Sequence, residues 1–158
     1  MTSAPFTYNK NKVIQALRYH FISKPEIKYL IIIVNVLSIL TAILFALKKI
    51  TPKPFFASSI LWVLLMLMFW YVLPHSVYKG GKNTFNDKFT ATLDEAGFTI
   101  ENNVGSRNWG WKQFYKLIES PHFFHLYFNA RAFFLVPKES FGNSVDDARE
   151  YLKQHIPS

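Results

Sequence analysis

The sequence contains two stretches of nineteen residues, Tyr29–Leu47 and Phe55–Leu73, in which no side chain is charged. As an α-helix with a rise of 1.5 Å per residue, each would be roughly 28 Å long, close to the ~30 Å hydrocarbon core of a bilayer. A soluble domain of this size rarely buries two such helices. The sequence therefore predicts a transmembrane hairpin, with helices over 29–47 and 55–73 and a short loop over 48–54.

The net charge of +8 is unevenly distributed along the chain. Residues 1–82 contain ten Lys or Arg and one acidic residue, giving +9, whereas residues 83–158 contain eight basic and nine acidic residues, giving −1. The positive charge thus flanks the apolar stretches, which indicates membrane topology and contact with anionic lipid. We expect the lipid bilayer as a partner and no nucleic acid, since nucleic-acid binding needs a basic stripe on the folded domain itself.

The positions of the Lys and Arg residues also predict an orientation. Five precede the first apolar stretch, three lie in the loop over 48–54, and Lys79, Lys82 and Lys88 follow the second stretch. Flanks rich in Lys and Arg remain in the cytoplasm. We therefore expect a multi-pass protein of the cytoplasmic (inner) membrane with both termini in the cytoplasm. Lys79 and Lys82 are candidate contacts to anionic lipid, each adding ~1 kcal/mol of attraction.

Residues 1–28 are predicted to form an amphipathic segment. Asn11 is a plausible N-cap for a helix over Lys12–Ile22, whose apolar residues fall on one face. Such a helix next to a membrane span fits the membrane surface, but it fits packing on the folded domain equally well. The first apolar stretch ends in two lysines rather than in small residues, so a cleaved signal peptide is not expected.

A ridge of small and polar residues runs along the first predicted span: Asn35, Ser38, Ala42 and Ala46. Small residues let helix backbones approach closely in lipid, and asparagine can form a hydrogen bond across the contact. The short loop makes the two spans antiparallel neighbours, so packing of this ridge on the second span is favoured. The alternative is a seam for an oligomer or for a larger complex. An ion site is disfavoured because neither span contains a charged partner.

The region from 83 to 158 changes to a period of two, typical of strands with one wet face. Strands are predicted over 85–93, 98–104, 115–119, 123–128 and 132–136, with a turn at 94–97 in which Gly97 takes a positive φ and a polar loop over 103–108. Ser144 is predicted to cap a final helix in which Val145, Ala148, Leu152 and Ile156 line one side. The fold class is therefore membrane α+β, a transmembrane helical hairpin followed by a small antiparallel β domain closed by a C-terminal helix.

No arrangement of residues predicts catalysis, a cofactor or a metal. His122 and His125 are spaced so that a strand would place them on opposite faces, and Asp94 and Glu95 belong to a turn without a pocket. Disulfides and thiolate sites are excluded because the chain contains no cysteine. We therefore expect a protein that is not an enzyme.

Three segments carry a resemblance to a known family: Phe89–Ile100, Trp111–Phe114 and Phe134–Phe141, the last with an apolar strand followed by Pro-Lys and a phenylalanine. In these segments the chain resembles the YcxB-like family of small bacterial membrane proteins. Trp109 and Gly110 depart from the family pattern. The resemblance implies two spans and a C-terminal domain similar to pleckstrin-homology (PH) domains, in which the family-signature residues Trp111, Pro137, Lys138 and Phe141 are structural.

The resemblance implies no established activity, because a fold does not determine a function. Our leading hypothesis is a non-enzymatic, membrane-anchored binding or regulatory module that presents a PH-like domain at the inner leaflet to anionic lipid or a protein partner. The alternative is a structural subunit of a larger membrane complex that docks through its transmembrane helices.

Overall fold

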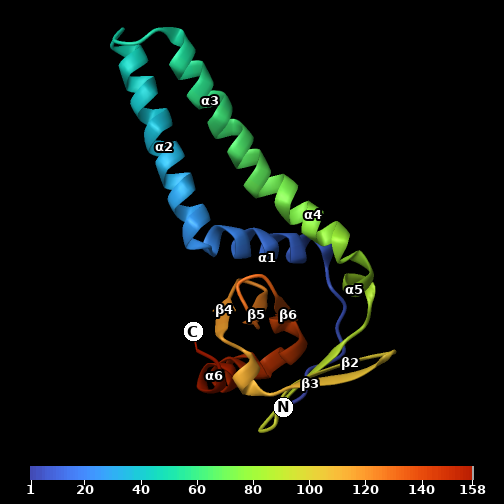
Figure 1. The fold of residues 1–158 in the computed structure, drawn as a ribbon. Coiled ribbons are helices and arrows are strands. Elements are labelled where there is room, and N and C mark those ends of the chain that lie inside the picture. The colour runs from blue at the N-terminus through green and yellow to red at the C-terminus, as the bar shows by residue number, and fades with distance from the viewer. Residues whose placement is uncertain (158) are drawn as a thin grey trace. The chain divides into compact units, whose positions relative to one another are not determined.

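The computed structural model of this chain describes residues 1–157, which form two compact units (Figure 1). The first, here called the hairpin unit, comprises residues 17–80. The second, here called the β unit, comprises residues 1–16 together with the chain from Gly81 onward. The chain therefore passes from the β unit into the hairpin unit and back again, and the return falls at the Gly80–Gly81 pair.

The two long helices of the hairpin unit, α2 and α3, begin at prolines. Pro25 and Pro52 each occupy the first turn of a helix, where a proline is favoured because its missing N–H would have no helical partner. In chain order the helices are α1 (Lys10–Ser23), which crosses from the β unit, α2 (Pro25–Ala46), α3 (Pro52–Leu67), the π-helix η1 (Met68–Val72) and α4 (Leu73–Gly80).

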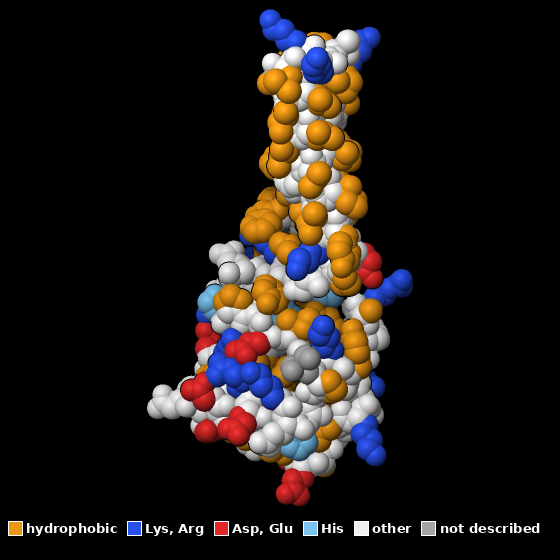
Figure 2. Space-filling model, turned by 90° about the vertical axis from the view of Figure 1, so that its left-hand side faces the viewer, with side chains coloured by type: hydrophobic (Ala, Val, Ile, Leu, Met, Phe, Trp, Pro, Cys, Tyr) orange, Lys and Arg blue, Asp and Glu red, His pale blue; other side chains and the backbone are white. Residues whose placement is uncertain are grey.

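Two helices of this unit are long and apolar enough to cross a membrane: Pro25–Ala46, with 22 residues, and the continuous helix Pro52–Gly80, with 29 residues. Both are longer than the stretches predicted from the sequence. Few of their side chains are buried: Val34 in α2, none in α3, and Phe69 and Pro74 further along the second helix. Figure 2 shows hydrophobic side chains along the whole hairpin and Lys or Arg side chains at its tip.

The β unit contains two antiparallel sheets of three strands, each in the order of the sequence. A short helix, α5 (Lys82–Asn86), precedes the first sheet, and α6 (Val145–His155) follows the second. The strands of the first sheet are β1 (Thr90–Asp94), β2 (Gly97–Asn102) and β3 (Gly105–Trp109), and those of the second are β4 (Lys116–Glu119), β5 (Phe123–Tyr127) and β6 (Phe133–Pro137).

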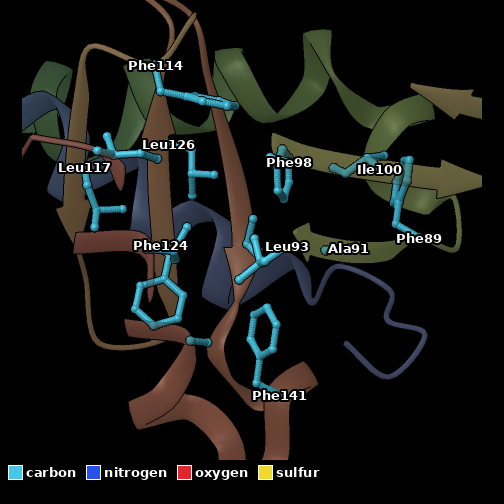
Figure 3. Close-up of a cluster of buried hydrophobic side chains, with 14 of the residues drawn as sticks. Phe89, Ala91, Leu93, Phe98, Ile100, Phe114, Leu117, Phe124, Leu126 and Phe141 are labelled. Carbon is cyan, nitrogen blue, oxygen red and sulfur yellow. The ribbon is translucent and has the colours of Figure 1, made fainter. Parts of the chain in front are cut away.

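The core of the β unit lies between the two sheets and α6, as Figure 3 shows for its strand residues. Phe98 from β2, Phe124 and Leu126 from β5, and Leu152 from α6 are fully buried in one cluster. Ala148 of α6 and Ile156, which directly follows the helix, are buried as well, and Val145 is partly buried, which confirms the stripe predicted for this helix. Burying large aromatic side chains is how a unit of this size gains stability from a thin core.

The first residues of the chain form part of the β unit, which the sequence did not reveal. They run antiparallel beside β1, where Ser3 N donates to Ala91 O at 2.8 Å and Phe6 N donates to Phe89 O at 2.8 Å. The phenyl ring of Phe6 is buried in the core. Lys12, in the first half of α1, forms an ion pair with Glu139. Of the two placements left open for this segment, residues 1–16 therefore pack on the folded domain.

Several element boundaries differ from those predicted. Asn9 rather than Asn11 caps α1, because its Oδ1 accepts hydrogen bonds from the N–H groups of Asn11 and Lys12 at 3.0 and 3.3 Å. Ser144 does precede α6, but its side chain forms no capping hydrogen bond. Phe85, expected in a strand, lies in α5, where its ring meets that of Tyr8 edge-on.

The predicted polar loop over 103–108 is wrong, because residues 105–109 form β3. The strand pairs with β2 without interruption, from Asn102 opposite Gly105 to Phe98 opposite Trp109. Its first four residues are glycine or polar and are exposed, and only Trp109 is partly buried, so the strand shows no alternation of apolar residues. Val104, expected to face inward, lies in the tight turn and is 90% exposed.

Gly97 should be the least replaceable glycine of the β unit. Its φ is +151°, and a Cβ atom placed there would lie 2.1 Å from the carbonyl oxygen of Trp109. We expect Gly97→Ala to lower the free energy of unfolding by at least about 2 kcal/mol, through strain and overpacking. Chemical denaturation in detergent measures this loss. Gly105→Ala is the matched control, since nothing lies within 4 Å of its Cβ position; equal effects of the two substitutions would contradict the prediction.

Candidate functional site

The polar residues of the two long helices face one another within the hairpin. The hydroxyl oxygens of Thr41 and Ser58 lie 2.6 Å apart, and the indole Nε1 of Trp62 donates to Asn35 Oδ1 at 3.0 Å. The amide of Asn35 also donates to the carbonyl of Ile31 in its own helix at 2.7 Å. Asn35 therefore joins α2 to α3, as packing of the ridge on the second span requires.

A groove of about 460 Å³ remains on the hairpin beside these hydrogen bonds. Asn35, Ser38 and Ala42 of the predicted seam line it, whereas Ala46, which is exposed, does not. Most of its remaining surface is apolar. The full set of lining residues is Asn35, Ser38, Ile39, Ala42, Phe55, Ser59, Trp62 and Val63.

Arg18 is joined to the π-helix at the far end of α3. Pro74 has no N–H to donate to the carbonyl of Trp70, four residues earlier, and Arg18 Nε donates to that carbonyl at 2.8 Å. The guanidinium carbon also lies 5.1 Å from the centre of the Trp70 ring, a cation–π distance. This contact attaches the end of α1 to the second long helix. In the sequence, Pro74 itself indicates that the carbonyl four residues earlier lacks its usual helical N–H partner.

The two lysines predicted to contact lipid lie at the junction of the units. Lys79 is in the last turn of α4, and Lys82 is the first residue of α5. Both side chains are exposed, so both are accessible to an anionic headgroup.

The family-signature residues lie around the core of the β unit. Trp111 Nε1 donates to the carbonyl of Asp94 at 2.9 Å, and its ring centre lies 4.9 Å from that of His155 on α6. Phe141 is buried, with its ring 6.4 Å from that of Phe124. These contacts tie the β1–β2 turn and the segment before α6 to the rest of the unit, which is what a structural role requires.

Pro137 and Lys138 fix the end of β6. Pro137 is buried opposite Phe123 of β5, and the backbone N–H of Lys138 donates to His122 O at 3.0 Å. The ammonium of Lys138 lies 2.6 Å from a carboxylate oxygen of Glu119. Lys138, which the sequence analysis treated only as a family signature, is thus engaged inside the unit.

Glu119 stands at the centre of an ion network. Lys138 and Arg149 both contact its Oε1, at 2.6 and 2.9 Å, and Arg149 also pairs with Asp146. Burial opposes ionisation of Glu119, but the hydrogen bonds from Lys138 and Arg149 outweigh it and lower the pKa of the carboxyl group. The hydrogen bonds that Arg149 donates to Glu119 and Asp146 raise the pKa of its guanidinium. The network attaches α6 to the end of β4.

This network should make the β unit sensitive to acid. Because the pKa of Glu119 is lower in the folded state, its contribution to stability is complete above the unfolded value of about 4.3 and is lost as the pH falls through the folded value. We expect Glu119→Gln to cost about 1–2 kcal/mol at neutral pH and progressively less below about pH 4. Denaturation curves over this range measure the difference. A difference in the free energy of unfolding between the wild type and Glu119→Gln that persists in acid would contradict this role of Glu119. Glu150→Gln, at an exposed position, is the control.

His122, His125 and Asp94 have different environments in the β unit. His122 is exposed, whereas His125 is fully buried and stacks on Phe133 with ring centres 5.7 Å apart. Asp94 accepts a hydrogen bond from the N–H of Gly97 at 2.9 Å and so serves the turn. Within residues 1–157, no group of three His, Cys, Asp or Glu side chains is placed to hold a metal ion.

The edges of the two sheets differ in what covers them. The N-terminal segment covers β1, while the N–H of Leu117 in β4 donates to the carbonyl of Pro157 at 2.7 Å. On β6, the carbonyl of Leu135 accepts a hydrogen bond from the hydroxyl of Tyr8 at 2.7 Å. At β3, by contrast, residues 105–108 are exposed, and within the described part of the chain this strand pairs only with β2.

Comparison with known proteins supports the resemblance seen in the sequence. Residues 93–155 match the family model described as YcxB-like protein. The match runs from β1 to the last residue of α6 and includes all four family-signature residues. No curated protein and no solved structure matches the chain.

Proposed function

We propose that this chain, which carries a YcxB-like domain over residues 93–155, is a non-enzymatic, membrane-anchored binding or regulatory module. The hairpin unit inserts in the inner membrane and holds the β unit at the cytoplasmic surface. The observation that carries the proposal is the exposure of α2 and α3, in which Val34 is the one side chain that is buried among the described residues. Leaving so much apolar surface in water is costly, and hydrocarbon removes that cost.

The domain boundaries proposed from the sequence place the spans at 29–47 and 55–73 and the folded domain at 83–158. A PH-like arrangement of that domain is supported by two three-stranded antiparallel sheets followed by one C-terminal helix. Its proposed role is to bind a ligand or a partner, while Glu119, Lys138 and Arg149 are engaged in structural contacts. Lys79 and Lys82 add attraction to anionic lipid beside the junction.

The topology can be tested with thiol labelling, because the chain contains no cysteine. Thr51 in the link and Lys112 in the β unit are both exposed. We expect a membrane-impermeant maleimide to label Thr51→Cys on intact spheroplasts, and Lys112→Cys only after lysis. Alkaline carbonate should leave both variants in the membrane pellet.

Two results would contradict the proposed topology. Labelling of Lys112→Cys before lysis would place the β unit outside the cytoplasm. Release of the protein by carbonate would remove the membrane anchor altogether.

A second candidate function is that of a structural subunit in a larger membrane complex. The groove beside Asn35, Ser38 and Ala42 favours it, because small side chains leave room for the backbone of a third helix. Asn35 is already bonded to Trp62, so the groove offers close packing rather than a free polar group.

Filling the groove distinguishes the two functions. If a further helix docks there, Ala42→Leu will reduce the size of the detergent-solubilised assembly, because the larger side chain blocks close approach. Size-exclusion chromatography with light scattering measures this change. Val36→Leu, at an exposed position of the same helix, is the control. An unchanged assembly size for Ala42→Leu would eliminate the groove as a docking seam.

A further inference from the structure

Within residues 1–157, strand β3 is the sheet edge that has no covering segment. Three other edges are occupied by the chain itself: β1 by the N-terminal segment, β4 at Leu117 by the carbonyl of Pro157, and β6 at Leu135 by the hydroxyl of Tyr8. An uncovered edge presents a row of backbone N–H and C=O groups that another extended chain can pair with. The contrast among the edges of one small unit singles out β3.

The backbone of the β3 edge is regular enough for a further strand to pair with it. Residues 105–109 pair with β2 in continuous register, without a bulge, and the strand contains no proline. Bulges, prolines and covering segments are the usual means by which a protein closes such an edge. Here a single charge, Arg107, stands on the strand, and two positions further on the Trp109 ring lies 5.1 Å from its guanidinium carbon.

We propose that the β3 edge binds an extended, acidic segment of a partner protein, which adds to the first sheet as a fourth strand. This inference rests on the proposed binding role of the β unit and names the surface and the chemistry of its partner. Backbone hydrogen bonds along residues 105–109 supply the attraction, and the side chains beside the strand select the sequence.

The residues beside β3 indicate what that sequence contains. A shallow hollow of about 280 Å³ adjoins the strand, lined by Ile100 and Val104 as well as by Arg107. The apolar side chains pack on an apolar residue of the partner, and the guanidinium of Arg107 pairs with a carboxylate. An extended segment with an acidic residue flanked at alternate positions by apolar ones satisfies both, because alternate residues of a strand share a face.

A second copy of this chain fits the edge less well. Two antiparallel β3 strands that pair over their full length about a two-fold axis place Arg107 opposite Arg107 of the copy. Side chains directly opposite are separated by about 4.5–5.5 Å at Cβ, and like charges at that separation are destabilising. Charge complementarity therefore favours an acidic partner over self-association.

The test uses the full chain in lipid nanodiscs and a fluorescein-labelled probe peptide, Thr-Thr-Val-Thr-Glu-Thr-Val-Thr-Thr. Two further peptides are compared: one with lysine in place of the glutamate, and one with N-methyl groups at alternate residues. Fluorescence anisotropy gives the affinities, and hydrogen exchange locates the protected amides. We expect saturable binding of the acidic peptide, slower exchange at residues 105–109, and loss of binding on N-methylation.

Charge reversal provides the decisive comparison. Arg107→Glu should lower the affinity for the acidic peptide by roughly fivefold, the upper range for one opposite-charge cross-strand pair. The same substitution should make the lysine peptide the better ligand. Arg131→Glu, at an exposed arginine in the β5–β6 turn, is the matched control and should leave both affinities unchanged.

Several results would overturn the inference: no saturable binding up to millimolar peptide, equal binding of the N-methylated peptide, protection outside residues 105–109, or no change with Arg107→Glu. Protection of these residues without peptide, together with dimers in native mass spectrometry, would assign the edge to a second copy instead. If the peptide does not bind at β3 while the thiol labelling places the β unit in the cytoplasm, only the proposed binding site is wrong. If the labelling fails, the membrane-anchored role itself is wrong.

Discussion

The exposure of α2 and α3 is the constraint from which the rest of the molecule follows. Few side chains of α2 and α3 are buried, and the contacts between the two helices include the polar pairs Thr41–Ser58 and Asn35–Trp62 and the stacked rings of Phe45 and Phe55. Every backbone group within a helix is satisfied internally, so such a hairpin tolerates a solvent that forms no hydrogen bonds. The same surface in water would carry a penalty of about 25 cal/mol for each Å². Both helices are long and apolar enough to cross a membrane.

The path of the chain couples this hairpin to the β unit at two points. The chain leaves the β unit within α1 and returns at Gly81, and the segment before α1 supplies hydrogen bonds to β1 and the buried ring of Phe6. The residues matched by the family model therefore form only part of the folding unit, since the segment that completes one sheet edge lies before the hairpin. The β unit is thus connected to the hairpin unit through two chain segments rather than one.

Residues with a strong local signal were predicted correctly from the sequence. The absence of charge over 29–47 and 55–73 anticipated two long helices, and alternation of apolar residues anticipated β1, β2 and the buried stripe of α6. The pairing of residues 1–6 with β1 could not be predicted, because it joins segments about ninety residues apart and leaves no periodic pattern. Asn9 and Asn11 are equally good caps by composition, and only the tertiary path selects Asn9. For the candidate site, the facing polar residues of the hairpin were foreseen, whereas the partners of Arg18 and Lys138 depend on three-dimensional contacts.

The error at residues 103–108 has a physical cause that bears on function. A strand is recognised in a sequence by its buried face, and β3 has almost none: Gly105, Ser106, Arg107 and Asn108 are all exposed. An edge strand of this kind owes its position to hydrogen bonds with one neighbour, and its other side chains and backbone groups are left facing solvent. The exposure of residues 105–108 makes β3 hard to recognise in the sequence, and the same exposure leaves its edge accessible to a partner. A polar edge also remains soluble while it is empty, whereas an apolar one would aggregate.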